Sequence, residues 1–153
     1  MTVPSKPLRT RILGVDFGFA RIGLAISDEQ KIITTALETL QSSKSVERAV
    51  VLLVQFLEKL TRDRGYNIER IVVGLPLKIN GTSSERTEAC KKFAELLEQS
   101  IQIPVTLWDE RLTTIQADRS LQESNFSRKK RARFVDAVSA IILLQSFLDS
   151  RAK

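Results

Sequence analysis

Short apolar runs separated by turn residues mark the strands of this sequence. Near the N-terminus, two such runs flank the turn Phe17–Ala20, in which Gly18 supplies backbone freedom, and together they predict a hairpin. The first of the two strands has apolar residues on both faces, as a central strand does. A third run, Lys31–Leu37, is rich in β-branched residues. The predicted strands cover about residues 11–16, 21–27, 31–37, 70–75 and 103–108.

Apolar residues recur at helical spacing between and after these strands. Ser45 is placed to cap a helix, and Gly65 follows the end of that helix. Two capping boxes are also predicted, one at Thr82–Glu85 and one at Thr113–Gln116. The predicted helices cover about residues 45–62, a stretch after the first capping box, about 113–122 and about 131–148.

The order of these elements predicts an α/β fold with a five-stranded mixed sheet and helices on both faces. Strands that follow a helical crossover run parallel, so the first, fourth and fifth strands are expected to share one direction. The chain has 153 residues and no repeat or linker, so we expect one domain, residues 1–153. No apolar run reaches the ~20 residues of a membrane span, and the first residues do not resemble a signal peptide. A cytoplasmic protein is expected.

Two features of the composition exclude whole classes of chemistry. The sequence has no histidine, which removes Ser-His and Cys-His nucleophilic pairs, histidine bases and histidine-ligated zinc. The single cysteine, Cys90, excludes a disulfide framework and a multi-cysteine zinc site, and is expected to be a small core residue. Any catalysis must therefore use carboxylates, lysine, arginine, hydroxyls or a metal with oxygen ligands, for which Mg²⁺ and Mn²⁺ are best suited.

The balance of charge favours a polyanionic partner. Lysine and arginine number 24 against 18 acidic residues, which gives a net charge of +6 and a pI of 9.8. One dense group, which we call the basic cluster, consists of Arg128, Lys129, Lys130 and Arg131, and we expect it in a loop before the last helix. A solvated surface is the alternative interpretation of such a group, so charge alone does not identify a nucleic-acid contact.

Several acidic residues stand at positions where a solvated carboxylate is not expected. Asp16 ends the first strand, and Asp109 with Glu110 ends the last. Asp136 lies on the same stripe of the final helix as Ala140. Sites in open sheets form beyond the carboxyl ends of parallel strands, where these acids would converge. Like charges this close repel unless cations neutralise them, and a pair of Mg²⁺ ions ~4 Å apart supports phosphodiester cleavage.

Each of these acids also has a purely structural interpretation. Asp16 could cap the turn that follows it, and Asp109 with Glu110 could be helix-entry acids favoured by the helix dipole. Asp136 could pair with an arginine of its own helix. Asp28 is interpreted as a turn residue. The register of the last strand decides whether Asp109 or Glu110 points into a site, and the sequence leaves both open.

Four motifs together resemble the YqgF (RuvX) family of RNase H-like proteins related to Holliday-junction resolvases. They are DFGFARIGLAISD at 16–28, IVVGLP with a downstream GT at 71–82, WDERLTT at 108–114, and RKKRARFVDAVSAIILLQSFLD at 128–149. The resemblance extends in order over nearly the whole chain. It implies an RNase H-like fold in which a carboxylate cluster binds divalent metal. One departure is Asn80, where the family often has aspartate, which weakens any metal role for that loop.

The resemblance also implies roles for single residues. It makes Asp16, Glu110 and Asp136 the catalytic carboxylates and the ligands of two Mg²⁺ or Mn²⁺ ions. The residues expected to contact substrate are Arg21, Arg111 and Thr113, together with Arg128, Lys129, Lys130 and Arg131 of the basic cluster.

The function that the resemblance implies is metal-dependent endonuclease cleavage of structured RNA, at the 5′ end of pre-16S rRNA during ribosome biogenesis. Two alternatives stay open: cleavage of four-way DNA junctions by the same site, and non-catalytic RNA binding in ribosome assembly. Ribosomal particles are further expected partners, a membrane is not, and the protein is expected to be a monomer or a homodimer. Nucleotide binding ranks last, because the actin-like and sugar-kinase folds need two domains and the chain lacks a GxxxxGKS/T phosphate loop.

Overall fold

The structure, a computed structural model, describes residues 9–78, 80–81, 83–110 and 128–151, and in the last range it describes side chains from residue 137 onward. None of the described helices combines the length and the apolar character that crossing a bilayer requires. The strands are β1 (Thr10–Phe17), β2 (Arg21–Ser27), β3 (Thr34–Ala36), β4 (Leu40–Gln41), β5 (Asn67–Leu75) and β6 (Val105–Asp109), and the helices are α1 (Val46–Arg64), α2 (Glu85–Ile101) and α4 (Arg128–Arg151).

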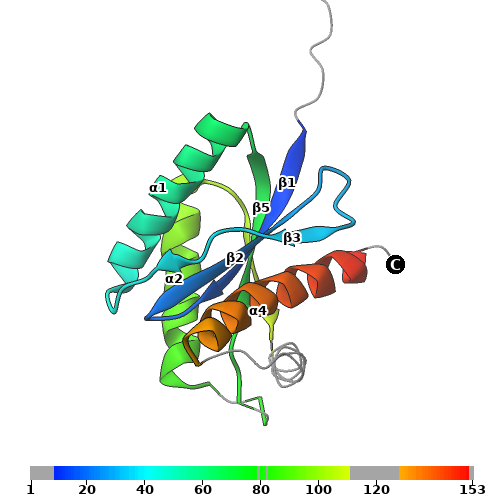
Figure 1. Ribbon diagram of the computed structural model, residues 1–153. Helices are drawn as coiled ribbons and strands as arrows, with labels where there is room; N and C mark the ends of the chain where they lie inside the picture. The colour runs from blue at the N-terminus through cyan, green and yellow to red at the C-terminus, as the bar shows by residue number, and fades with distance from the viewer. Residues whose placement is uncertain (1–8, 79, 82, 111–127, 152–153) are drawn as a thin grey trace, which may run out of the picture.

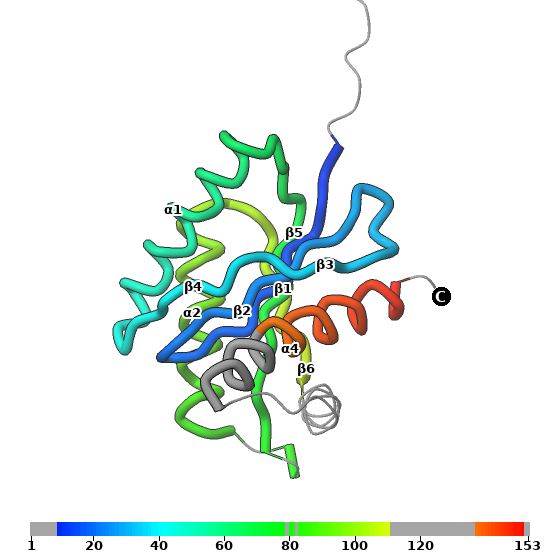
Figure 2. Tube along the Cα trace, viewed as in Figure 1, coloured from blue at the N-terminus to red at the C-terminus, as the bar shows by residue number. Residues whose placement is uncertain are grey.

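The described strands form one mixed sheet in the order β3-β2-β1-β5-β6, and β4 also pairs with β2 (Figure 2). β1 and β2 are antiparallel and make the predicted hairpin. β5 is parallel to β1, and β6 is parallel to β5. This confirms the mixed sheet and the shared direction of the first strand and the two strands that follow helices. The carboxyl ends of β1, β5 and β6 therefore meet at one end of the sheet.

Helices cover both faces of the sheet, as predicted: α1 and α2 lie on one face, and α4 crosses the other (Figure 1). β1 contributes to both layers because its side chains alternate. Leu13 and Val15 are buried with α1 and α2, whereas Ile12 is buried with α4. On that second face a Cβ on Gly14 would lie only 2.8 Å from Leu144 Cβ, so this glycine lets α4 pack directly on β1.

The ends of α1 follow the predicted signals. Ser45 Oγ accepts a hydrogen bond from Arg48 N at 3.2 Å, which satisfies one of the free N–H groups of the first turn. Gly65 closes the helix in the left-handed region with φ 69°, and its N–H donates to Thr61 O. The predicted helix is therefore confirmed, with its last turn extended to Arg64.

The strand predicted over residues 31–37 is correct only in part. Lys31 has φ 59°, and Asp28 Oδ1 accepts hydrogen bonds from the backbone N–H groups of Ile32 and Ile33 at 2.7 and 3.0 Å. These bonds hold the segment in a turn, which confirms Asp28 as a turn residue. Pairing with β2 begins only in β3 and resumes in β4. The described sheet thus has six strands rather than the predicted five.

The capping box predicted at Thr82–Glu85 is wrong. α2 is capped by Ser84, whose Oγ accepts from Thr87 N at 3.2 Å while Ser84 N donates to Thr87 Oγ1 at 2.9 Å. The buried Thr87 hydroxyl also donates to the carbonyl of Pro76, just beyond β5. This bond ties the first turn of α2 to the chain leaving β5, and it selects a capping box two residues later than the local sequence suggests.

The last helix begins earlier than predicted. The basic cluster, which we expected in a loop, forms the first residues of α4. Lysine and arginine are good helix formers, and neither glycine nor proline interrupts the sequence between Arg128 and Arg151. The predicted capping box and helix over residues 113–122 lie outside the described residues.

Candidate active site

Asp16 lies near the carboxyl end of β1, opposite Gly23 of β2. Its side chain is only 12% exposed. By the alternation of the strand, Asp16 faces the same side of the sheet as Gly14, which is the side covered by α4. A buried central strand therefore carries this carboxylate to the edge of the core, where sequence analysis expected a site.

Glu110 follows directly after β6 and is the inward-pointing acid of the Asp109–Glu110 pair. Its backbone N–H donates to Leu75 O at 3.3 Å, which continues the pairing of β5 and β6 by one residue. Glu110 is 6% exposed, whereas Asp109 is exposed at the end of the edge strand. The register, which the sequence could not supply, therefore directs Glu110 to the candidate site.

Gly74 of β5 makes the approach of the two carboxylates possible. β5 lies between the strands that carry them, and two strands separated by a third are about 10 Å apart. A Cβ on Gly74 would lie 2.2 Å from Glu110 Oε2 and 3.3 Å from Leu143 Cδ2. Because Gly74 has no side chain, the Glu110 carboxylate lies across β5 in the space that any other residue would fill.

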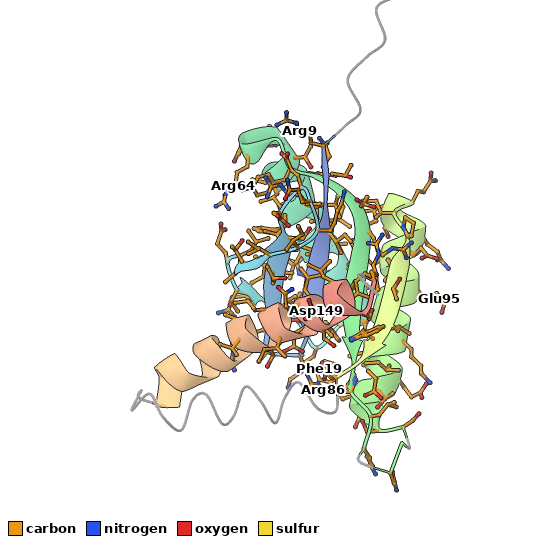
Figure 3. The ribbon with its side chains drawn as sticks, turned by 90° about the vertical axis from the view of Figure 1, so that its right-hand side faces the viewer. Arg9, Phe19, Arg64, Arg86, Glu95 and Asp149 are labelled. Carbon is orange, nitrogen blue, oxygen red and sulfur yellow. The ribbon has the colours of Figure 1, made fainter. Side chains whose placement is uncertain are left out.

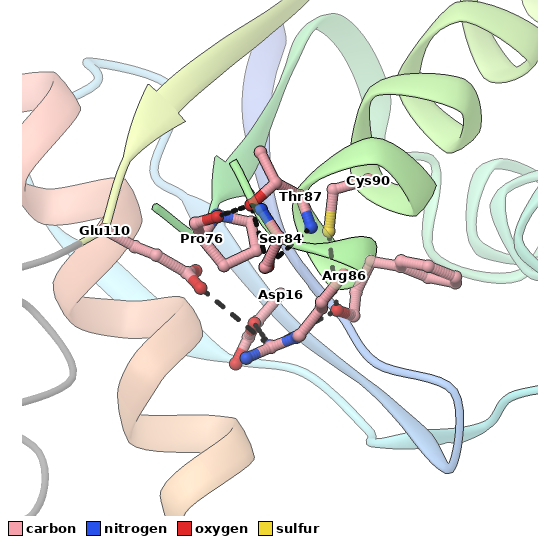
Figure 4. A network of polar contacts seen from close by, with 8 residues as sticks. Asp16, Pro76, Ser84, Arg86, Thr87, Cys90 and Glu110 are labelled. Atoms are coloured by element: carbon pink, nitrogen blue, oxygen red, sulfur yellow. Dashed lines mark hydrogen bonds and ion pairs between the residues drawn. The ribbon is translucent and has the colours of Figure 1, made fainter. Parts of the chain in front are cut away.

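Arg86, from the first turn of α2, connects the two carboxylates (Figure 4). Its Nη2 lies 3.4 Å from Asp16 Oδ1 and 3.8 Å from Glu110 Oε1. The same nitrogen donates to Phe17 O at 3.4 Å. Three acceptors from two distant parts of the sheet thus surround one guanidinium group.

Sequence reasoning missed Arg86, although its position carries a signal. A cation in the first turn of a helix is opposed by the helix dipole, whereas Glu85 and Glu88 of the same turn follow the ordinary preference. Figure 3 shows Arg86 at the end of the sheet opposite to Arg9. An arginine held against the dipole indicates an acidic partner nearby.

Burial and charge repulsion raise the pKa of Glu110 to about 7. The largest cause is the removal of solvent from its carboxyl group, followed by the charge of Asp16, while Arg86 opposes both and Asp109 adds a further rise. Two carboxylates share one guanidinium that is itself 49% exposed. Such a site favours a bound proton or a further cation.

An apolar wall fixes α2 against β1 behind the carboxylates. The rings of Phe17 and Phe93 stack with their centroids 4.4 Å apart. Cys90 is fully buried beside them, with its Sγ 3.9 Å from Phe17 O, and burial raises the pKa of its thiol to about 12. This confirms Cys90 as a core residue. The packing also fixes the helix that carries Arg86.

Arg21 lies on the same face of the sheet as Asp16. It begins β2, two residues before Gly23, which pairs with Asp16. With Thr39, Leu40 and Gln41 it lines a small cavity of about 310 Å³. A phosphate contact by Arg21 stays a prediction.

The remaining predicted site residues are described in part or not at all. Asp136 belongs to α4, one helical turn before Ala140, whose backbone O would lie 3.3 Å from a Cβ on Gly14. The helix therefore crosses β1 at Gly14, two residues before Asp16. The side chains of Asp136 and of the basic cluster lie outside the described part of the chain, as do Arg111 and Thr113 entirely.

The donor set fits a hard divalent cation. Asp16 and Glu110 offer carboxylate oxygens, the ligands that Mg²⁺ and Mn²⁺ prefer, and such an ion would offset the repulsion from Asp16 that helps to raise the pKa of Glu110. Among the described side chains, no three acidic or cysteine residues gather as a ligand group. The predicted third ligand, Asp136, belongs to the part of α4 whose side chains are not described.

Solved structures similar to this one define its class of fold. Thermus thermophilus RuvC in complex with a Holliday junction substrate has a TM-score of 0.52 at 16% identity, over 94% of this chain and 96% of that one. A ROK hexokinase of the same organism has a TM-score of 0.51 at 21% identity, but the match covers only 38% of its chain. The nearly complete match in both directions to RuvC places this protein in the RNase H-like class of folds, as predicted.

Sequence comparison then gives the family. A family model described as "RuvX: Holliday junction resolvase" matches residues 10–150. A protein of Protochlamydia amoebophila (strain UWE25) named "Putative pre-16S rRNA nuclease" is 52% identical over 147 residues, which are 96% of this chain and 98% of that protein. A protein of Bacillus cytotoxicus with the same name is 43% identical over 92% of this chain and 99% of its own length. The chain belongs to the RuvX family.

Proposed function

We propose that this protein is a metal-dependent endonuclease that hydrolyses phosphodiester bonds in structured RNA, with Asp16, Glu110 and Asp136 as metal ligands. The observation that carries the proposal is that Asp16 and Glu110 both approach the guanidinium group of Arg86. The intervening strand, β5, has a glycine, Gly74, where the Glu110 carboxylate crosses it. A buried carboxyl whose pKa is raised, as that of Glu110 is, disfavours folding at neutral pH, and such groups are concentrated at functional sites.

The residues of the chain divide the proposed work between them. The backbone of Glu110 is positioned by the pairing of β6 with β5, which extends to the Glu110 N–H, and the missing side chain of Gly74 leaves space for the carboxylate over β5. Asp16 stands at the edge of the core, where a substrate phosphate can approach. Together Asp16 and Glu110 would hold a divalent ion, which would supply charge neutralisation and a lowered pKa of water, the chemistry that phosphodiester hydrolysis needs. Arg21 and the basic cluster are proposed to hold the nucleic-acid backbone.

The proposed substrate is the 5′ leader of pre-16S rRNA. The names of relatives that are 52% and 43% identical over nearly the full chain support it, and a net charge of +6 suits a polyanion. Four-way DNA is the second candidate, supported by the description of the family model. Likeness of fold does not choose between them, because one fold serves many substrates.

Asp16→Asn tests the proposal. With Mg²⁺ or Mn²⁺ present, we expect cleavage of a pre-16S leader RNA to fall by at least about 100-fold, since the variant removes a ligand charge and keeps the shape. RNA binding should stay equal or become tighter, because one negative charge is lost. Asp63→Asn is the matched control: Asp63 is half exposed on α1 and pairs with Arg62, so the same change of charge there should leave cleavage unchanged.

Each other outcome leads to a different conclusion. Equal cleavage by purified wild type and Asp16→Asn would contradict the proposed site. RNA binding without any cleavage by wild type would indicate an assembly factor. A side-by-side assay in which only four-way DNA is cut would select the second candidate, and paired symmetric nicks would indicate a dimer, because two active sites must then act together.

A further inference from the structure

Arg86 occupies the space between the two carboxylates that a metal ion would share. We propose that Arg86 is a resident counter-cation of this pair: it holds Asp16 and Glu110 together without metal and is displaced toward solvent when a divalent ion binds, so that it sets the metal affinity of the site. This inference rests on the proposed metal-binding function and goes beyond it, because it assigns a role to a residue of α2 that belongs to neither carboxylate strand.

The contacts of the Arg86 side chain are long enough for it to move away from the two carboxylates. One nitrogen, Nη2, faces all three acceptors at 3.4 to 3.8 Å, whereas strong charged hydrogen bonds measure about 2.7–2.9 Å and arginine often binds carboxylate through two parallel bonds. The shortest ion pair among the described residues is much closer: Lys31 Nζ lies 2.6 Å from Glu69 Oε1. The Arg86 guanidinium is therefore attracted to the pair without being locked to it.

The backbone under Arg86 is fixed, so displacement needs only a rotation of the side chain. Ser84 and Thr87 close the capping box on either side of it, and Thr87 is bonded to Pro76. The Arg86 side chain is 49% exposed, whereas those of Asp16 and Glu110 are 12% and 8% exposed. The guanidinium is therefore the most solvent-accessible of the three groups, and Figure 4 shows it reaching the two carboxylates from α2.

The charge balance makes the two cations competitors. A divalent ion held by both carboxylates would lie within a few ångströms of the present guanidinium position, and like charges that close repel. Removal of Arg86 should therefore tighten metal binding. A residue that only supported the shape of the site would have the opposite effect, because its removal would loosen the ligands and weaken binding.

The test is Mn²⁺ binding by the metal-free protein, followed through the electron paramagnetic resonance signal of unbound Mn²⁺. Arg86→Gln is expected to bind Mn²⁺ about tenfold more tightly than wild type, a moderate factor because the side chain is half exposed and solvent screens its charge. Arg62→Gln, an exposed arginine of α1 paired with Asp63, is the matched control and should bind as wild type does. Arg86→Gln binding with equal or weaker affinity would overturn the inference.

The same titration separates this inference from the function on which it rests. Failure of wild type to bind Mn²⁺, or equal binding by Asp16→Asn, would contradict the proposed metal site itself. Wild-type binding that depends on Asp16 but not on Arg86 would contradict only the role of Arg86.

A second measurement uses only the wild-type protein, so it does not depend on whether a variant folds. In the NMR spectrum of wild type, the Nε–Hε signal of Arg86 should shift as Mg²⁺ saturates the site, whereas that of Arg62 should not. A saturating amount of Mg²⁺ that leaves the Arg86 signal in place would overturn displacement.

Discussion

Replacing Gly74 by alanine is expected to remove nuclease activity while costing little stability. The added Cβ would lie 2.2 Å from Glu110 Oε2, and real Cβ atoms essentially never approach another heavy atom closer than 3.0 Å. The carboxylate must therefore retreat by about 1 Å to reach an ordinary contact distance. Because Glu110 is 6% exposed and enclosed by β5 and α4, the retreat moves it out of the place from which it reaches Arg86 and the proposed metal.

The magnitudes of the two effects differ for a physical reason. The displaced atom is the end of a flexible side chain, so the overpacking cost should be about 1 kcal/mol. The contact with Leu143 Cδ2, at 3.3 Å, requires a shift of only a few tenths of an ångström. A misplacement of about 1 Å at a catalytic group, by contrast, can cost about 100-fold in rate. We therefore expect kcat/KM to fall by about 100-fold.

The assay compares kcat/KM on leader RNA with the free energy of unfolding from denaturant titration in EDTA. Gly65→Ala is the matched control. Gly65 ends α1 with φ 69° and has nothing within 4 Å of an added Cβ, so alanine there costs about 1 kcal/mol through its left-handed backbone alone. The control should lose similar stability and keep full cleavage.

Cleavage by Gly74→Ala within about threefold of wild type would refute the reasoning, since the placement of Glu110 would then be unimportant. An equal loss of activity in Gly74→Ala and Gly65→Ala would attribute the effect to stability instead of geometry.

Two further predictions follow from burial. The metal-free protein should lose stability as the pH rises from about 4.5 to about 7, because Glu110 holds its proton more tightly when folded, with a pKa of about 7, than when unfolded. The loss is on the order of 3 kcal/mol in urea titrations with EDTA, and Glu110→Gln should remove it; a variant with an unchanged pH dependence would contradict the assignment. Cys90, buried and with its pKa raised to about 12, should react with thiol reagents at pH 8 only at the rate of unfolding, and rapid reaction of the folded protein would contradict its placement.

Features that depend on neighbouring residues could be predicted from the sequence. The hairpin around Gly18 follows from two apolar runs and a glycine, and the limits of α1 follow from Ser45 and Gly65. The position of Asp16 could also be predicted, because a carboxylate near the end of a strand buried on both faces must lie at the edge of the core, at the carboxyl end of that strand. These signals act within one turn or one strand, so tertiary contacts did not override them.

Features that depend on distant contacts could not be predicted in the same way. Thr82 and Ser84 both suit a helix cap, and the bond from Thr87 to Pro76 selects Ser84. The inward position of Glu110 depends on the pairing of β6 with β5, which turns Glu110 into the protein and leaves Asp109 exposed. A shift of one residue in that register would exchange them.

The two residues that sequence analysis did not assign both violate a local preference. A glycine inside a buried strand weakens the strand and marks a close approach by another group, and Gly74 is where the Glu110 carboxylate lies against β5. An arginine in the first turn of a helix opposes the helix dipole, and Arg86 is where the guanidinium meets Asp16 and Glu110. Each local cost is offset by the same carboxylate pair. Departures from local preference are expected at functional sites, and in this chain the two departures point to one place from opposite faces of the sheet.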